Sequence, residues 1–166
     1  MSARRAAGLT LSLLVAALAA LPIACNDAPP PAAIEEGTKV RIGDLTIQAE
    51  LARTPEERAR GLSGRPSLPE DGGMLFVLSE ERRPAFWMLD MRFPLDFIWV
   101  SSDGRVADLT QDVPPPEPGA SQLPRYQPVR PVLYVLEVNA GTVRRAGVEI
   151  GDAVTFDPPV SAVETP

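Results

Sequence analysis

Five short apolar runs separated by turn residues constrain the fold of this chain more than any other feature of its sequence. Their content of Val, Ile, Leu and aromatic residues favours β-strands, and they occupy residues 72–78, 85–89, 97–101, 105–110 and 131–138. Several runs are apolar at successive rather than alternate positions, which predicts strands covered on both faces. We therefore predict a mostly β (α+β) single domain, built as a small barrel-like or wrapped sheet.

Other patterns add a hairpin, two short helices and a long loop to this sheet. Residues 40–51 alternate apolar and polar side chains on either side of a Gly-Asp turn, which predicts a β-hairpin. Residues 54–57 (TPEE) carry a capping-box pattern that starts a short helix. A second short helix is expected from Thr142 until Gly147 stops it. Residues 113–131, the proline-rich loop, contain seven of the 19 prolines and predict no regular structure.

The N-terminal residues predict export and membrane attachment. Residues 1–25 have a basic start, an apolar stretch and small residues before Cys25, a pattern that resembles a bacterial lipoprotein signal with Cys25 as the lipidated residue. A cleaved, soluble export signal is the alternative, because proline stands three places before the cysteine where such signals usually carry leucine. The remainder divides into a Pro/Ala-rich tether (26–37), a β domain (38–157) and a loose tail (158–166). We expect the protein to face the periplasm of a bacterial cell envelope.

Charge and residue counts exclude several classes of function. The formal net charge is −6, and removing residues 1–25 takes away two arginines and no acids, which gives −8. A nucleic-acid partner is therefore not expected. The chain has no histidine and one cysteine, which excludes the usual histidine-dependent catalytic sets, most zinc sites and a disulfide. Met88 and Met91 could suit a soft metal, but methionines also fill β cores, and we predict neither a metal nor a cofactor.

Five sequence blocks follow one another between residues 57 and 154, within a resemblance that covers nearly the whole of residues 45–156: ERARGLSGR, GMLFVL, FWMLDMRFPLDFIWV, VLEVNAG and GVEIGDAV. Together they resemble the family of domain of unknown function 192 (DUF192). The resemblance implies a small, mostly β domain that occurs alone or as an exported protein, with no established activity. It also shows a difference, because Leu89 stands where the family often has lysine or arginine and Asp90 where it often has asparagine. If that cation contacts an anionic ligand elsewhere in the family, the contact is missing here.

Ionisable and aromatic side chains inside or beside the apolar runs form the candidate site. Asp90, Asp96 and Glu137 interrupt apolar runs, where a carboxylate without a partner is costly. Arg58 lies on the first predicted helix, and Trp87 could stack on a sugar ring or another planar ligand. We predict that these five residues line a ligand-binding groove between the segment that carries Trp87 and the proline-rich loop.

Three functions stay open at this point. The first choice is a membrane-tethered, non-catalytic module that binds a small ligand or an envelope protein. The second is a carboxylate-dependent hydrolase of envelope glycans, with Asp96 and Glu137 as its acid and base. The third is a purely structural lipoprotein. The acids also have a structural interpretation, in which they stabilise the fold and bind no ligand. In this interpretation Asp96 accepts hydrogen bonds from local backbone amides just after Pro94, and Asp90 marks a turn or kink.

Overall fold

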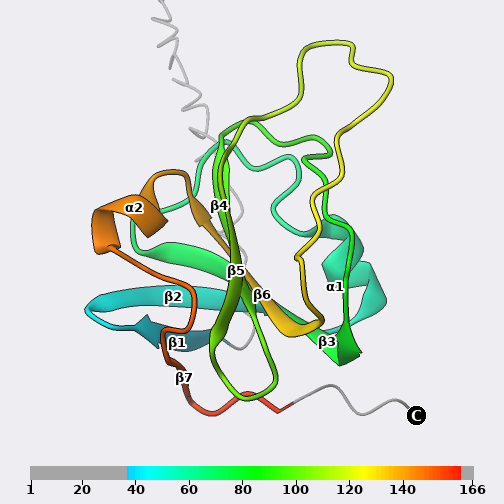
Figure 1. The fold of residues 1–166 in the computed structure, drawn as a ribbon. Helices are drawn as coiled ribbons and strands as arrows, with labels where there is room; N and C mark the ends of the chain where they lie inside the picture. Colours follow the sequence, from blue (N-terminus) through cyan, green and yellow to red (C-terminus); the bar gives the residue numbers. More distant parts are fainter. Residues whose placement is uncertain (1–36, 162–166) are drawn as a thin grey trace, which may run out of the picture. The chain divides into compact units, whose positions relative to one another are not determined.

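The structure is a computed structural model that describes residues 37–161, so the predicted signal, the predicted lipidation site Cys25 and nearly all of the predicted tether lie outside the described residues. Seven strands and two short helices follow one another along these residues (Figure 1): β1 (Gly37–Ile42), β2 (Leu45–Ala52), α1 (Pro55–Arg60), β3 (Gly72–Arg82), β4 (Leu95–Val100), β5 (Val106–Val113), β6 (Val132–Asn139), α2 (Thr142–Ala146) and β7 (Val154–Asp157). The prediction of a mostly β domain with a wrapped sheet is confirmed.

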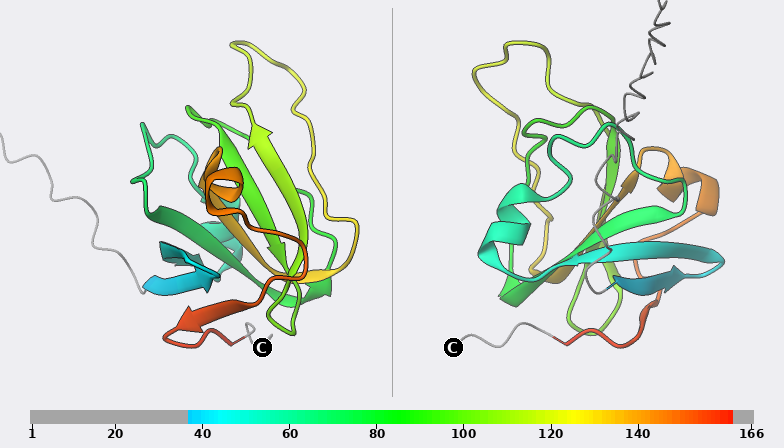
Figure 2. Two further views of the ribbon diagram at one scale, coloured as in Figure 1. Left: turned by 60° about the vertical axis from the view of Figure 1, so that its left-hand side comes forward. Right: turned by 180° about the vertical axis from the view of Figure 1, so that it is seen from behind.

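All seven strands belong to one sheet, in the order β5-β4-β6-β3-β2-β1-β7. Only β2 and β3 run parallel, and α1 makes the crossover between them; the other neighbours are antiparallel. The predicted hairpin is present as β1 and β2, with Ile42 paired to Leu45 across a two-residue turn. Figure 2 shows that the sheet curls strongly, so its two edge strands approach each other.

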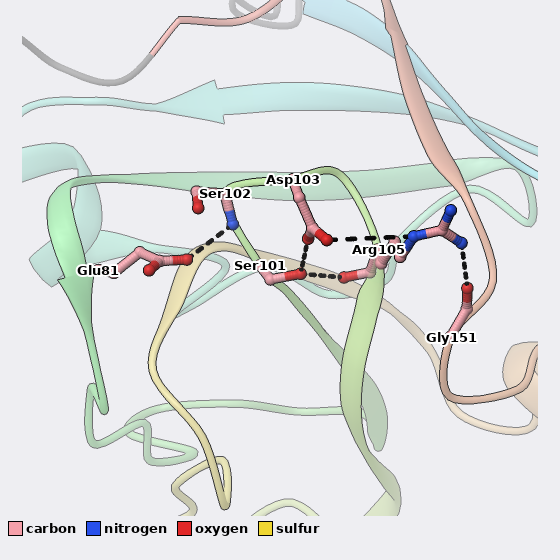
Figure 3. Close-up of polar contacts among 6 residues, drawn as sticks. All are labelled: Glu81, Ser101, Ser102, Asp103, Arg105 and Gly151. Atoms are coloured by element: carbon pink, nitrogen blue, oxygen red, sulfur yellow. Dashed lines mark hydrogen bonds and ion pairs between the residues drawn. The ribbon is translucent and has the colours of Figure 1, made fainter.

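The two edge strands are joined at one corner of the curled sheet. Arg105, which precedes β5, forms a bridge with Ala153, which precedes β7. The amide of Val154 donates to the carbonyl of Gly104 at 2.8 Å, and the Arg105 guanidinium donates to the carbonyl of Gly151 at 3.0 Å (Figure 3). Main-chain and side-chain contacts together therefore close part of the gap between β5 and β7.

The turn between β4 and β5 is itself fixed by polar contacts, which Figure 3 shows beside this corner. The hydroxyl of Ser101 donates to Asp103 and to the carbonyl of Arg105. The amide of Ser102 donates to the carboxylate of Glu81 on β3 at 2.9 Å. Hydrogen bonds from the side chain and the amide of Ser102 lower the pKa of Glu81, because they stabilise its ionised form. The turn is thereby held against both β3 and the residues that lead into β7.

The central strands β3, β4 and β6 are buried on both faces, as their uninterrupted apolar runs predicted. Paired residues of neighbouring strands point to the same face of a sheet. Phe76 of β3 and Trp99 of β4 both pair with Val135 of β6, so these three lie on one face, which we call the outer face. The residues one position away lie on the inner face, inside the curl of the sheet.

The predicted strand at residues 85–89 is wrong. This segment belongs to the β3–β4 connection (residues 83–94), in which Phe86 alone forms an isolated bridge, to Tyr126 of the proline-rich loop. The Phe86 ring lies edge-on to Phe76 at 4.8 Å and to Trp99 at 5.5 Å between ring centroids. The apolar side chains of the connection thus cover the outer face instead of extending the sheet. The rest of the proline-rich loop has no regular structure, as predicted.

Both helices begin where their sequence signals predicted, and α2 also ends at the predicted residue. Thr54 accepts a hydrogen bond from the Glu57 amide at 3.1 Å, and the Glu57 carboxylate accepts one from the Thr54 amide at 2.9 Å, which completes the capping box. Hydrogen bonds from the amides of Thr54 and Arg53 to its carboxylate lower the pKa of Glu57. Gly147 ends α2 in the left-handed region, with φ of 64°. After β7, residues 158–161 lie against the sheet, and Val160 is buried.

Candidate functional site

A cavity of about 400 Å³ lies on the outer face of the sheet. One wall is α1 with the turn that follows it, and the other is the β3–β4 connection together with Arg82 at the end of β3. Phe76 and Leu78 of β3 and Glu137 of β6 form its floor. The lining is mainly aliphatic and aromatic with a few charged groups, which is the usual composition of a small-molecule site.

Glu137 is the one acid that lines this cavity. It lies in β6 between Met74 of β3 and Phe97 of β4, and only 5% of its surface is exposed. Within residues 37–161 its carboxyl group receives no hydrogen bond and no ion pair, and burial alone raises its pKa to about 8. A carboxyl group with this pKa is mainly protonated at neutral pH, so it can donate a hydrogen bond as well as accept one.

Three arginines surround the same cavity. The Arg58 guanidinium donates to the carbonyls of Arg53 and of Val77, the latter at 3.1 Å, which fixes α1 against β3. Arg60 and Arg82 are exposed at the cavity's edge. Within the described part of the chain, none of these three arginines forms an ion pair with a carboxylate. The cavity therefore combines a polar group on its floor with cations around its walls.

Trp87 also lines the cavity, and 40% of its surface is exposed. The guanidinium of Arg125, from the proline-rich loop, lies 4.4 Å from the centre of the Trp87 ring, a cation–π geometry. The loop therefore contacts Trp87 from outside the cavity. We had predicted that the loop forms the opposite wall of the groove, and this prediction is wrong. That wall is α1 and the turn after it.

Asp96 does not line the cavity, although we predicted it there. Because Phe97 pairs with Glu137 on the outer face, the preceding residue Asp96 points to the inner face. Its carboxylate is fully buried and accepts hydrogen bonds from the amides of Asp112 at 2.8 Å and Val143 at 3.0 Å. The structural interpretation of Asp96 is thus correct in kind, but its donors come from β5 and α2 and not from the local bend.

Asp90 also lies outside the cavity, in contrast to our prediction. It is exposed in a turn of the β3–β4 connection, with φ of 53°, and its carbonyl accepts a hydrogen bond from the Gly64 amide at 2.9 Å. Three of the five predicted residues, Arg58, Trp87 and Glu137, are therefore brought together, and two acids are not.

Two charged residues at the cavity, Arg60 and Arg82, were missed from the sequence. Arg60 carried no usable signal, because it follows Arg58 by two residues, a spacing that directs side chains to different sides of a helix. Arg82 carried none either, because the predicted strand ended at residue 78, whereas β3 continues to Arg82.

The described residues offer neither a metal centre nor a membrane span. Within residues 37–161, no three His, Cys, Asp or Glu side chains are placed to hold a metal ion. No helix in the same residues combines the length and apolar character needed to cross a bilayer.

Fold and cavity together define a curled β-sheet domain with a small-molecule-sized pocket on its outer face. Residues 38–156 match the model of the DUF192 family, described as an uncharacterized ACR, and the chain belongs to this family. No curated protein matches the chain.

Two crystal structures share this fold. One is a protein from Sinorhizobium meliloti 1021, provisionally described as a transcription regulator; it is 33% identical, with a TM-score of 0.65 over 74% of this chain and 95% of that one. The other is a protein of unknown function from Novosphingobium aromaticivorans DSM 12444; it is 33% identical, with a TM-score of 0.63 over 71% of this chain and 82% of that one.

Proposed function

We propose that this protein is a non-catalytic binding module of the bacterial cell envelope, and that a small ligand occupies the cavity above Glu137. The observation that carries the proposal is the Glu137 carboxyl group, which lies at the cavity floor and is hydrogen-bonded by no other group of residues 37–161. A buried polar group is costly unless it is hydrogen-bonded. A ligand that bonds to Glu137 removes this cost, whereas packing alone gives no reason to keep an acid there.

The arrangement of the acids supports binding over glycan hydrolysis. Hydrolysis by a carboxylate pair requires both groups to flank one scissile bond. Asp96 and Glu137 point to opposite faces of the sheet, and Asp96 is engaged by two backbone amides. A small ligand is also favoured over an envelope protein as partner, because the polar group to be satisfied lies at the bottom of a cavity.

Attachment to the membrane through Cys25 is the second part of the proposal, and it rests on the signal-like residues 1–25. The net charge of −6 supports a partner other than nucleic acid. Fractionation of cells that express the wild-type chain or Cys25→Ser tests the anchor. We expect the wild type in the membrane fraction and the variant in the soluble fraction. A variant that still sediments with membranes contradicts lipid attachment.

A fragment screen by thermal shift tests ligand binding in the cavity. Ala59 lines the cavity from α1, so Ala59→Phe places a large side chain in it, whereas Ala146→Phe makes the same change on the exposed surface of α2. Ligands stabilise the state that binds them. We expect fragments that raise the melting temperature of the wild type and of Ala146→Phe to lose their effect on Ala59→Phe. Equal responses of the three proteins contradict this location of the site.

A further inference from the structure

We infer that the cavity takes a small organic anion, with a carboxylate or phosphate head against Arg58, Arg60 and Arg82 and an apolar body over the floor. The inference rests on the proposed function and names the class of ligand. It follows from three features of the cavity: the balance of charge around it, the fixed position of one arginine, and the apolar lining between the arginines and Glu137.

The balance of charge around the cavity favours an anion. Its charged lining residues are three arginines and a single acid, Glu137, in a chain whose formal net charge is −6. Only some of the cations elsewhere in the described residues form ion pairs with acids: Arg65 with Glu50, Arg105 with Asp103 and Arg144 with Asp112. The arginines of the cavity have no such partner in residues 37–161. A carboxylate or phosphate is the group that the planar guanidinium binds best.

Arg58 is held in place for such a contact. Both of its hydrogen bonds to backbone carbonyls leave from Nη1, so the donors on Nε and Nη2 remain for a ligand. Because its position is already fixed by α1 and β3, it loses little conformational freedom when it binds. Arg60, on the same helix, and Arg82, across the cavity, are exposed and can turn towards the same head group.

The floor suits the rest of the ligand. Phe76, Leu78, Phe86 and Met91 supply apolar surface between the arginines and Glu137. The residues paired with Glu137 across the sheet, Met74 and Phe97, are uncharged, and the β3–β4 connection contributes no charged lining residue.

Among the described residues, the charged groups that line the cavity with Glu137 are therefore the three arginines, and burial raises the pKa of Glu137 to about 8. In its protonated form Glu137 donates a hydrogen bond to a ligand oxygen without repelling an anion.

A cationic ligand is the competing class, because a carboxylate beneath aromatic rings can also bind an amine. The two classes respond to pH with opposite signs. An anion binds the protonated form of Glu137, so its affinity falls as pH rises through the pKa of this group, whereas an amine binds the ionised form, so its affinity rises. A carboxylate and a primary amine keep their own charge from pH 6 to pH 9, whereas a phosphate monoester has a second pKa of about 6, so the pH profile is measured with the carboxylate and the amine.

Probes built on one 2-phenylethyl body separate these classes: 3-phenylpropionate, 2-phenylethyl phosphate, 3-phenylpropanamide and 3-phenylpropylamine, titrated into the full chain. The chain has two tryptophans, Trp87 at the cavity and Trp99 in the core. We expect the two anions to shift the indole N–H resonance of Trp87 more than that of Trp99, and to bind at least ~10-fold more tightly than the amide or the amine. The tighter of the two anions identifies the head group as carboxylate or phosphate.

Substitution of the exposed arginines tests the head-group contact. In the double variant Arg60→Gln, Arg82→Gln we expect the Kd of the tighter anion to rise ~10-fold, with little change for 3-phenylpropanamide. Arg41→Gln, on the exposed surface of β1, removes a charge elsewhere and is expected to leave both values unchanged. Equal effects of the double variant and of Arg41→Gln on anion binding overturn the inference.

The pH profile tests the role of Glu137. For the wild type we expect the Kd of the anion to rise ~10-fold between pH 7 and pH 9, as the linkage of one proton requires. In Glu137→Gln, which keeps the shape but does not titrate, the Kd is expected to stay constant. If the amine binds instead and tightens with pH, or if no anion binds, the inference about the ligand class fails. The proposed function fails separately, when no fragment distinguishes Ala59→Phe from Ala146→Phe.

Discussion

Glu137 makes the stability of this domain fall as the pH rises, and the size of the effect can be worked from the structure. Burial raises the pKa of Glu137 from the ordinary value of 4.5 to about 8 in the folded protein. Between these two values the folded protein binds one proton more than the unfolded chain. The free energy of unfolding therefore decreases with pH by about 1.4 kcal/mol per pH unit, or about 5 kcal/mol over the whole interval.

The sign follows from the direction of the pKa shift. Below pH 4.5 Glu137 is protonated in both states, and its contribution to stability is fully present. The contribution is lost as the pH rises to about 8, and above that value the folded state carries an ionised, unpaired carboxylate. Glu57 and Glu81, whose pKa values are lowered in the folded state, act in the opposite direction at acidic pH.

Comparison of the wild type with Glu137→Gln isolates this effect. Urea unfolding is followed by tryptophan fluorescence at pH 5, 6, 7, 8 and 9, because the m-value also reports any change in the surface exposed on unfolding. We expect the variant to gain about 4 kcal/mol relative to the wild type between pH 5 and pH 9. Glu117→Gln, an exposed acid of the proline-rich loop, is the matched control and is expected to run parallel to the wild type. Parallel profiles for Glu137→Gln and the wild type refute the reasoning.

Three substitutions test the fold by equilibrium unfolding. Asp96→Ala leaves two backbone amides without their acceptor. We therefore expect the free energy of unfolding to fall by about 2 to 3 kcal/mol and the melting temperature to fall by several degrees. The control Asp103→Ala, at an exposed position, is expected to give a much smaller loss. Gly73→Ala places a methyl carbon 2.7 Å from the Ile47 side chain and 2.9 Å from a backbone oxygen of β6. We expect the free energy of unfolding to fall by about 1 to 3 kcal/mol. An unchanged unfolding midpoint contradicts the close packing. Thr54→Ala removes the capping box of α1 and is expected to lose about 1 kcal/mol; no loss shows that the cap is dispensable.

Local chemistry was enough to predict most elements of the fold. The Gly-Asp turn set the hairpin, the Thr54–Glu57 pair set the start of α1, and the uninterrupted apolar runs indicated strands buried on both faces. The failure at residues 85–89 has a physical cause. Phe86 is apolar because it packs against aromatic rings of the outer face, and composition alone does not separate a segment that covers a sheet from a strand within it.

The candidate site was only partly predictable, because it depends on which face of the sheet each side chain points to and on the register of neighbouring strands. Asp96 and Glu137 both interrupt apolar runs, yet the pairing of Phe97 with Glu137 sends Asp96 to the opposite face. A shift of one residue in that pairing would have placed Asp96 beside Glu137 on the same face. Arg58 and Trp87 lie beside Glu137 through the crossover helix and the β3–β4 connection, long-range contacts that no local pattern specifies.

The corner that joins Arg105 to Gly151 and Ala153 has a consequence for self-association. An open sheet offers unpaired main-chain groups along its outermost strands, on which another chain can add as a further strand. Here the outermost strands satisfy part of those groups with each other, so a shorter template is left for edge-to-edge aggregation. Loss of β7 would therefore expose the main-chain groups of β1 and of the beginning of β5 together, and both would become available for pairing with another chain.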